Sequence, residues 1–85
     1  MRPLGFDSAR QLGAVVRTFR ERSGLTQVEL ARRAGVERQW LVLFENGKVD
    51  NPMLGNVLAV TDALNLRLQA VEAPATGVDL DDLFG

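Results

Sequence analysis

The chain has 85 residues, a formal net charge of −1, and no cysteine, histidine or tyrosine. A chain this short fits one small domain, which hides only about 60% of its unfolded surface and should have modest stability. The absence of cysteine excludes disulfides and thiolate metal sites, and the absence of histidine removes the usual general base and zinc ligand. We therefore expect a protein that is not an enzyme and that holds neither a cofactor nor a metal ion.

The sequence contains no recognisable targeting or membrane segment. No apolar run approaches the roughly 20 residues that a membrane-spanning helix needs. The N-terminal stretch MRPLGFDSAR lacks the apolar core of a signal peptide. We expect a cytoplasmic protein with no membrane partner.

The charged residues are unevenly distributed along the chain. Residues 1–50 hold nine basic and six acidic side chains, a net charge of +3, whereas residues 51–85 hold one basic and five acidic side chains, a net charge of −4. A basic half followed by an acidic half suggests an anionic partner for the first half. Ordinary solvated charge is the alternative.

The first expected element is a helix over about residues 8–22. Ser8 is a suitable N-cap, and Gln11, three residues further on, completes a capping box. Ser23-Gly24 marks the end of the helix. Apolar residues recur within it at helical spacing and form one stripe: Leu12, Val15, Val16 and Phe19.

The second expected helix begins at Thr26. Thr26 and Glu29 form a Thr-x-x-Glu capping box, which is the clearest start signal in the chain. Gly35 follows the apolar residues of this segment and suits a left-handed position at the helix end.

A third helix is expected over about residues 37–46, in the stretch VERQWLVLFENGK. Only about three residues separate it from the preceding helix, which is typical of a helix-turn-helix unit. Helical spacing directs Leu41 and Phe44 into the core, and Trp40 lies at its edge. The same spacing directs four residues outward: Arg38, Gln39, Val42 and Leu43.

A fourth helix is expected to begin at Asn51-Pro52, with Asn as the cap and Pro at the first helical position. Asn65 can end this helix in a left-handed turn. The expected buried stripe consists of Leu54, Val57, Leu58, Thr61 and Leu64.

Apolar and polar residues then alternate in a strand pattern over about residues 66–72, with Leu66, Leu68 and Ala70 on one side. One strand cannot form a sheet alone, and the sequence contains no second strand pattern. We expect the same strand of a second copy to pair with it in a homodimer. The alternative is a loop whose residues merely alternate.

Residues 74–85, PATGVDLDDLFG, resemble a flexible tail of acidic and hydrophobic residues. Such tails often serve only solubility. They also fold into a partner's groove with apolar side chains as anchors, here Leu80, Leu83 and Phe84.

The predicted helix-turn-helix unit indicates DNA binding. Its second helix would enter the major groove and bring Arg38 and Gln39 to base edges, where Arg pairs with guanine and Gln with adenine. Gln27 lies in the first turn of the preceding helix, where free N–H groups and the helix dipole favour a phosphate. Solvated surface and a plain helix start are the alternatives for these residues.

Three further positions extend the candidate interface. The Asn46-Gly47-Lys48 turn could bring backbone N–H groups and a cation to a phosphate, or could simply end the helix. The outward apolar residues Val42 and Leu43 are compatible with thymine methyl groups or with a protein interface.

Several short motifs carry a family resemblance: LTQxELAxxAGV at residues 25–36 and FENGK at residues 44–48. With these motifs the chain resembles the Cro/phage-repressor-type helix-turn-helix family, also called the Xre family, over about residues 9–66. The RQW, DAL and LRL pieces at residues 38–40, 62–64 and 66–68 are most similar to HipB-like antitoxins.

The resemblance implies an all-α, lambda-repressor-like domain of four to five helices over residues 8–73, with a strand at about 66–72 that pairs across a dimer. It also implies binding to a palindromic operator, repression of the protein's own operon, and neutralisation of a HipA-like serine/threonine kinase toxin. A stand-alone repressor is the alternative, and an interaction adaptor without DNA binding is a third reading.

Residue by residue, the resemblance matches Gln27 to a phosphate- or base-contacting Gln and Arg38 and Gln39 to a base-reading pair. Leu43 stands where many relatives carry a polar base contact. Glu37 stands where a capping Ser or Thr is usual.

Overall fold

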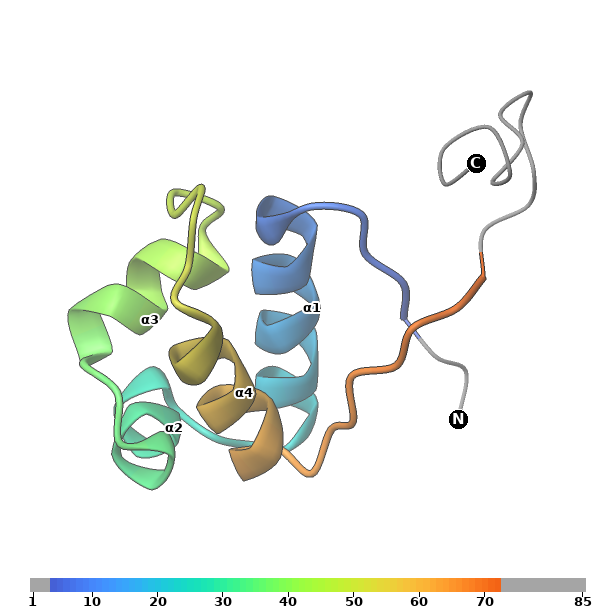
Figure 1. Cartoon of the computed structure of the whole chain (residues 1–85). Coiled ribbons are helices and arrows are strands. Elements are labelled where there is room, and N and C mark those ends of the chain that lie inside the picture. The colour runs from blue at the N-terminus through green and yellow to red at the C-terminus, as the bar shows by residue number, and fades with distance from the viewer. Residues whose placement is uncertain (1–3, 73–85) are drawn as a thin grey trace.

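The computed structural model describes residues 4–72, and within them the chain forms four helices. These are α1 (Ala9–Arg22), α2 (Gln27–Ala34), α3 (Arg38–Glu45) and α4 (Leu54–Ala63) (Figure 1). The described part is all-α, as predicted, with the lower of the two expected helix numbers. The three-residue connection between α2 and α3 forms the turn of the predicted helix-turn-helix unit.

Side-chain caps begin α1 and α2. Ser8 Oγ accepts the Gln11 N–H at 3.1 Å. The Gln11 carboxamide reaches one residue further back than predicted, because it accepts the N–H of Asp7 and not that of Ser8.

The capping box predicted for α2 is present in full. Thr26 Oγ1 accepts the Glu29 N–H at 3.1 Å, and Glu29 Oε1 accepts the Thr26 N–H at 3.0 Å. The Thr26 backbone N–H, and then its hydroxyl, lower the pKa of the Glu29 carboxyl below its usual value. The cap is therefore intact at neutral pH and weakens as the pH falls through that lowered pKa.

Each of the four helices is followed, one or two residues after its last residue, by a position with positive φ: Gly24, Gly35, Gly47 and Asn65. After α3, the Gly47 N–H donates to Phe44 O at 3.1 Å and the Lys48 N–H donates to Leu43 O at 2.9 Å. This is the Schellman pattern, which satisfies the carbonyl groups of the last turn. Asn65, with φ 57°, confirms the predicted left-handed end of α4, a conformation that Asn tolerates better than other side chains.

The start predicted for α4 at Asn51-Pro52 is wrong. The helix begins at Leu54, after Met53, and has no side-chain cap. Pro52 instead belongs to the connection from α3 and lines an apolar groove with Leu54 and Val57. Val49 of this connection packs against the core, and the backbone is still extended at Met53, so tertiary packing outweighs the local start signal.

The buried stripe predicted for α4 is only partly correct. Val57, Val60 and Thr61 are buried, whereas Leu54 is 66% exposed and Leu58 is 46% exposed. Both faces of α4 carry apolar residues, so the sequence period does not reveal which face meets the core.

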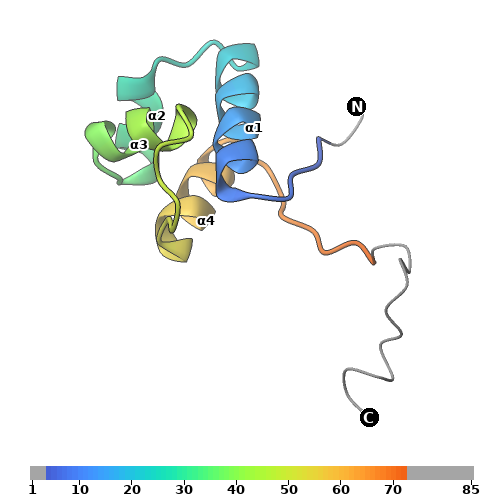
Figure 2. The ribbon, with the colours of Figure 1, turned by 90° about the horizontal axis from the view of Figure 1, so that it is seen from above.

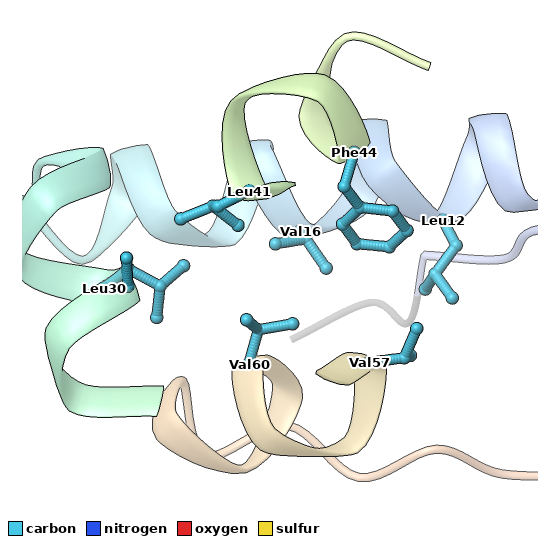
Figure 3. Close-up of a cluster of buried hydrophobic side chains, with 8 residues drawn as sticks. Leu12, Val16, Leu30, Leu41, Phe44, Val57 and Val60 are labelled. Carbon is cyan, nitrogen blue, oxygen red and sulfur yellow. The ribbon is translucent and has the colours of Figure 1, made fainter. Parts of the chain in front are cut away.

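All four helices contribute to one hydrophobic core (Figure 3). The predicted inward residues Leu41 and Phe44 are fully buried, which confirms the core role of α3. The Trp40 ring is half-buried and stacks on Phe44 with the ring centroids 4.8 Å apart. The fully buried side chains of greatest volume are Phe44, Leu30, Leu41, Val16 and Val60.

Helix α1 lies unusually close to the end of α3 at Gly13. A Cβ atom on Gly13 would be 1.9 Å from Phe44 O, so no larger residue fits without moving the two helices apart. This contact determines how closely α3 approaches α1.

A buried ion pair between Arg20 and Glu45 connects α1 to the end of α3. Arg20 is 9% exposed and Glu45 is 4% exposed. Arg20 Nε donates to Glu45 Oε2 at 2.7 Å, and Arg20 Nη2 donates to Glu45 Oε1 at 2.9 Å. Arg20 Nη1 also donates to Leu25 O at 2.8 Å. The hydrogen bonds to Glu45 raise the pKa of Arg20 above its usual value, so the guanidinium stays charged.

The predicted strand at residues 66–72 is not formed within the single chain, where these residues have no regular secondary structure. A strand requires hydrogen bonds to another strand, and the expected partner is a second copy, so the pairing remains a prediction. Leu68 is half-buried and packs against the core of its own chain. None of the helices within residues 4–72 has the length and apolar composition needed to cross a bilayer.

Gly13→Ala should lower the free energy of unfolding by about 1–3 kcal/mol, because the new methyl group collides with backbone and not with a flexible side chain. Gly55→Ala is the matched control, since Gly55 also lies in a helix and has open space at its Cβ position. This control should raise the stability by roughly 0.5–1 kcal/mol. Urea denaturation at one protein concentration measures both, and an equal response would contradict the close contact.

Arg20→Met should cost about 3–5 kcal/mol, because it leaves the Glu45 carboxylate buried without its cation. The double variant Arg20→Met/Glu45→Leu should lose less, since it removes both charges. Arg17→Met is the control at the exposed Arg17–Glu21 pair, where about 0–1 kcal/mol is expected. If denaturation curves showed the double variant to be less stable than Arg20→Met alone, the stability loss could not be attributed to the unpaired carboxylate of Glu45.

Candidate nucleic-acid interface

The outward face of α3 carries most of the predicted contact residues. Arg38 and Gln39 are exposed in the first turn, and Leu43 is 37% exposed one turn later. Val42 is only half-buried, so it lies at the margin of this face and not fully outward as predicted. Glu37 precedes the helix and makes no side-chain capping bond, in keeping with its departure from the usual Ser or Thr.

The turn after α3 cannot offer its backbone N–H groups to a phosphate in the way that the sequence suggested. The N–H groups of Asn46, Gly47 and Lys48 already donate to Val42 O, Phe44 O and Leu43 O. The Schellman turn uses the same donors that a phosphate would need. Asn46 and Lys48 are exposed and can contribute only through their side chains.

Sequence reasoning missed Arg10 as a neighbour of this turn. A Cβ atom on Gly47 would be 2.7 Å from Arg10 Cγ, so the Arg10 side chain runs directly across the turn. Arg10 and Lys48 therefore bring two cations to the end of α3. Since they are far apart in the sequence, no local pattern could have paired them.

Gln27 connects the start of α2 to the end of α3. Its side chain is half-buried, and Nε2 donates to Glu45 Oε1 at 3.1 Å. Gln27 thus lies near Glu45, the last residue of α3, whereas Arg38 lies at the other end of this helix, about 10 Å from Glu45 along the helix axis.

We use the name recognition surface for the predicted residues that α2, α3 and the following turn bring together, with Arg10 added. The members offer guanidinium, carboxamide and ammonium donors around a small apolar area, a chemistry suited to base edges and phosphates. Within residues 4–72, no group of three acidic side chains could hold a metal ion. The recognition surface consists of Arg10, Gln27, Arg38, Gln39, Val42, Leu43, Asn46 and Lys48.

The residues predicted to form a dimer lie elsewhere. In Figures 1 and 2, segment 66–72 leaves the molecule on the side opposite α2 and α3. Leu66 and Leu68 line an open groove with Leu58 of α4, and Ala70 is exposed. The predicted toxin-docking residues Leu80, Leu83 and Phe84 lie outside the described residues.

Residues 11–82 match the family described as "Helix-turn-helix domain". An uncharacterized HTH-type transcriptional regulator of Archaeoglobus fulgidus is 39% identical over 54 residues, which cover 64% of this chain and 76% of the relative. This relative is described as a transcriptional regulator.

Solved structures agree with the sequence comparison. A HipB variant in complex with an O2 20mer has a TM-score of 0.77 and 27% identity, covering 86% of this chain and 100% of that chain. A chain of a HipA-HipB-O2-O3 complex has a TM-score of 0.76 and 26% identity, covering 85% of this chain and 100% of that chain. SinR, a master regulator for biofilm formation, in complex with DNA, has a TM-score of 0.63 and 27% identity, covering 66% and 89%. The chain belongs to the helix-turn-helix family and, within it, to the HTH-type transcriptional regulators.

Proposed function

We propose that this regulator binds double-stranded DNA through the recognition surface and represses transcription as a homodimer on a palindromic operator. The observation that carries the proposal is that Arg38 and Gln39 stand exposed at the start of a helix whose other face is anchored in the core. The likeness to SinR in complex with DNA supports it. A helix held in this way can enter the major groove without rearrangement.

The two ends of α3 have different tasks in this proposal. Arg38 donates two hydrogen bonds to guanine, Gln39 pairs with adenine, and Leu43 contacts a thymine methyl group. At the other end, Arg10 and Lys48 neutralise phosphates and set the register of the helix in the groove. The buried charge of Glu45 does not repel the DNA, because Arg20 neutralises it.

A second copy of the chain accounts for the apolar residues that the single chain leaves uncovered. Met53 and Leu54 are 71% and 66% exposed, and Leu58 lies in the groove that Leu66 and Leu68 also line. A helix with apolar residues on all sides is normally buried on all sides. If a twofold axis ran beside α4 and segment 66–72, the second copy would cover this face. Its own segment 66–72 would then be the strand with which this segment pairs.

Within this function, we propose the role of a HipB-like antitoxin that also neutralises a HipA-like serine/threonine kinase toxin. The likeness to HipB and to a chain of a HipA-HipB-O2-O3 complex supports this reading. Leu80, Leu83 and Phe84 would be the toxin-docking anchors. The likeness to SinR supports a stand-alone repressor as the second candidate. A kinase-like gene beside the gene for this chain would favour the antitoxin, and its absence would favour the lone repressor.

DNA binding is tested by gel-shift titration on the DNA upstream of the chain's own gene. We expect log K to fall by about 0.9 per log unit of salt for each neutralised phosphate. Arg38→Ala should cost about 1–3 kcal/mol on the specific site and less on random DNA. Arg22→Ala is the control, since the Arg22 guanidinium lies over the Phe19 ring on α1. The absence of any salt-sensitive complex would refute the proposal.

The dimer is tested by sedimentation. Leu54→Asp/Leu58→Asp should convert the dimer to monomer, because the two side chains are 66% and 46% exposed in the single chain and the new charges would be fully buried only in the dimer. Gln69→Pro should weaken the dimer by removing a strand N–H. Val28→Asp, at an apolar α2 position that is 43% exposed, should leave the mass unchanged. An unchanged mass for the first two variants would place the interface elsewhere.

A further inference from the structure

The carboxamide of Gln27 rests on the buried ion pair beneath the recognition surface. Glu45 Oε1 accepts a hydrogen bond from Gln27 Nε2 at 3.1 Å and another from Arg20 Nη2 at 2.9 Å. Arg20 is in turn bonded to Glu45 Oε2 and to Leu25 O. Glu45, which accepts the hydrogen bond of Gln27, is therefore held in place by Arg20 and is 4% exposed.

The chemistry of Glu45 determines which way the carboxamide is turned. An ionised carboxylate only accepts hydrogen bonds, so Gln27 must present its nitrogen and not its oxygen. This pairing uses one of the two hydrogens on Nε2. The second hydrogen and the Gln27 oxygen remain for an outside partner, next to the N–H groups at the start of α2 that have no intrahelical acceptor.

We infer that Glu45 is a positioning residue for the DNA contact of Gln27. A side chain that is free in solution must be immobilised on binding, which weakens affinity by roughly 2- to 10-fold. Gln27 has already been immobilised through Glu45 before DNA arrives, whereas Gln39 on the same surface is exposed. The Arg20–Glu45 pair thus orients a side chain of the recognition surface as well as connecting α1 to α3 in the core. This inference rests on the proposed DNA binding.

The first test measures side-chain order in the free protein. ¹⁵N relaxation of the carboxamide groups should give Gln27 an order parameter near that of rigid backbone, about 0.85, and Gln39 a value below about 0.6. Glu45→Gln should loosen Gln27 and leave Gln39 unchanged. A Gln27 carboxamide as mobile as that of Gln39 in the wild-type chain would overturn the inference, even if the variant does not fold.

The second test is a double-mutant cycle in gel-shift affinity for the DNA upstream of the chain's own gene. Glu45→Gln should weaken binding roughly 2- to 10-fold when Gln27 is present and less than about twofold in a Gln27→Met background. Glu21→Gln is the control, because it removes a neighbouring negative charge from an exposed glutamate on α1 that pairs with Arg17 and lies 4.0 Å from Arg20 Nη2. Equal losses in the two backgrounds would mean that Glu45 acts only on stability, which overturns the inference.

The inference and the proposed function fail in different ways. If the wild-type chain forms no salt-sensitive complex with DNA, both are wrong. If a complex forms while Gln27 is mobile or the cycle is additive, only the positioning role of Glu45 is wrong.

Discussion

A guanidinium and a carboxylate, both almost fully buried, hold together the elements that form the helix-turn-helix unit. Arg20 of α1 meets Glu45 at the end of α3 through two hydrogen bonds and also bonds the Leu25 carbonyl just before α2. Burial of either charge alone would be strongly unfavourable, so the two helices must approach in the one arrangement that pairs them. Gly13 permits the same approach on the apolar side, because a larger residue would collide with Phe44 O.

This arrangement explains the unusually apolar composition of α3. Leu41 and Phe44 are fully buried, Trp40 stacks on Phe44 at the core edge, and the last residue of the helix is the buried acid itself. The helix is thereby anchored along its inner side. Only a narrow outer face with Arg38, Gln39 and Leu43 remains for contact with a partner, and its orientation is set by the core beneath it.

Local signals in the sequence predicted the helix-turn-helix unit well. The Thr26–Glu29 capping box and the left-handed ends at Gly35 and Asn65 depend on residues within a few positions of one another, and all are present. Predictions that needed knowledge of packing were less accurate. Asn51-Pro52 has the features of a helix start but belongs to the connection before α4, whose backbone stays extended as far as Met53. The backbone donors after α3 are already used by the turn that ends the helix.

The sequence by itself determined where α1, α2 and α3 begin and end and that Leu41 and Phe44 of α3 face inward, because caps and helical spacing are local properties. Only the tertiary structure decided which apolar face of α4 meets the core, that Arg20 pairs with Glu45, and that Arg10 lies beside the turn before Lys48. The reason is physical. A contact between residues more than 20 positions apart depends on how whole helices pack, and several partners of suitable charge or size are available to each residue until that packing is formed.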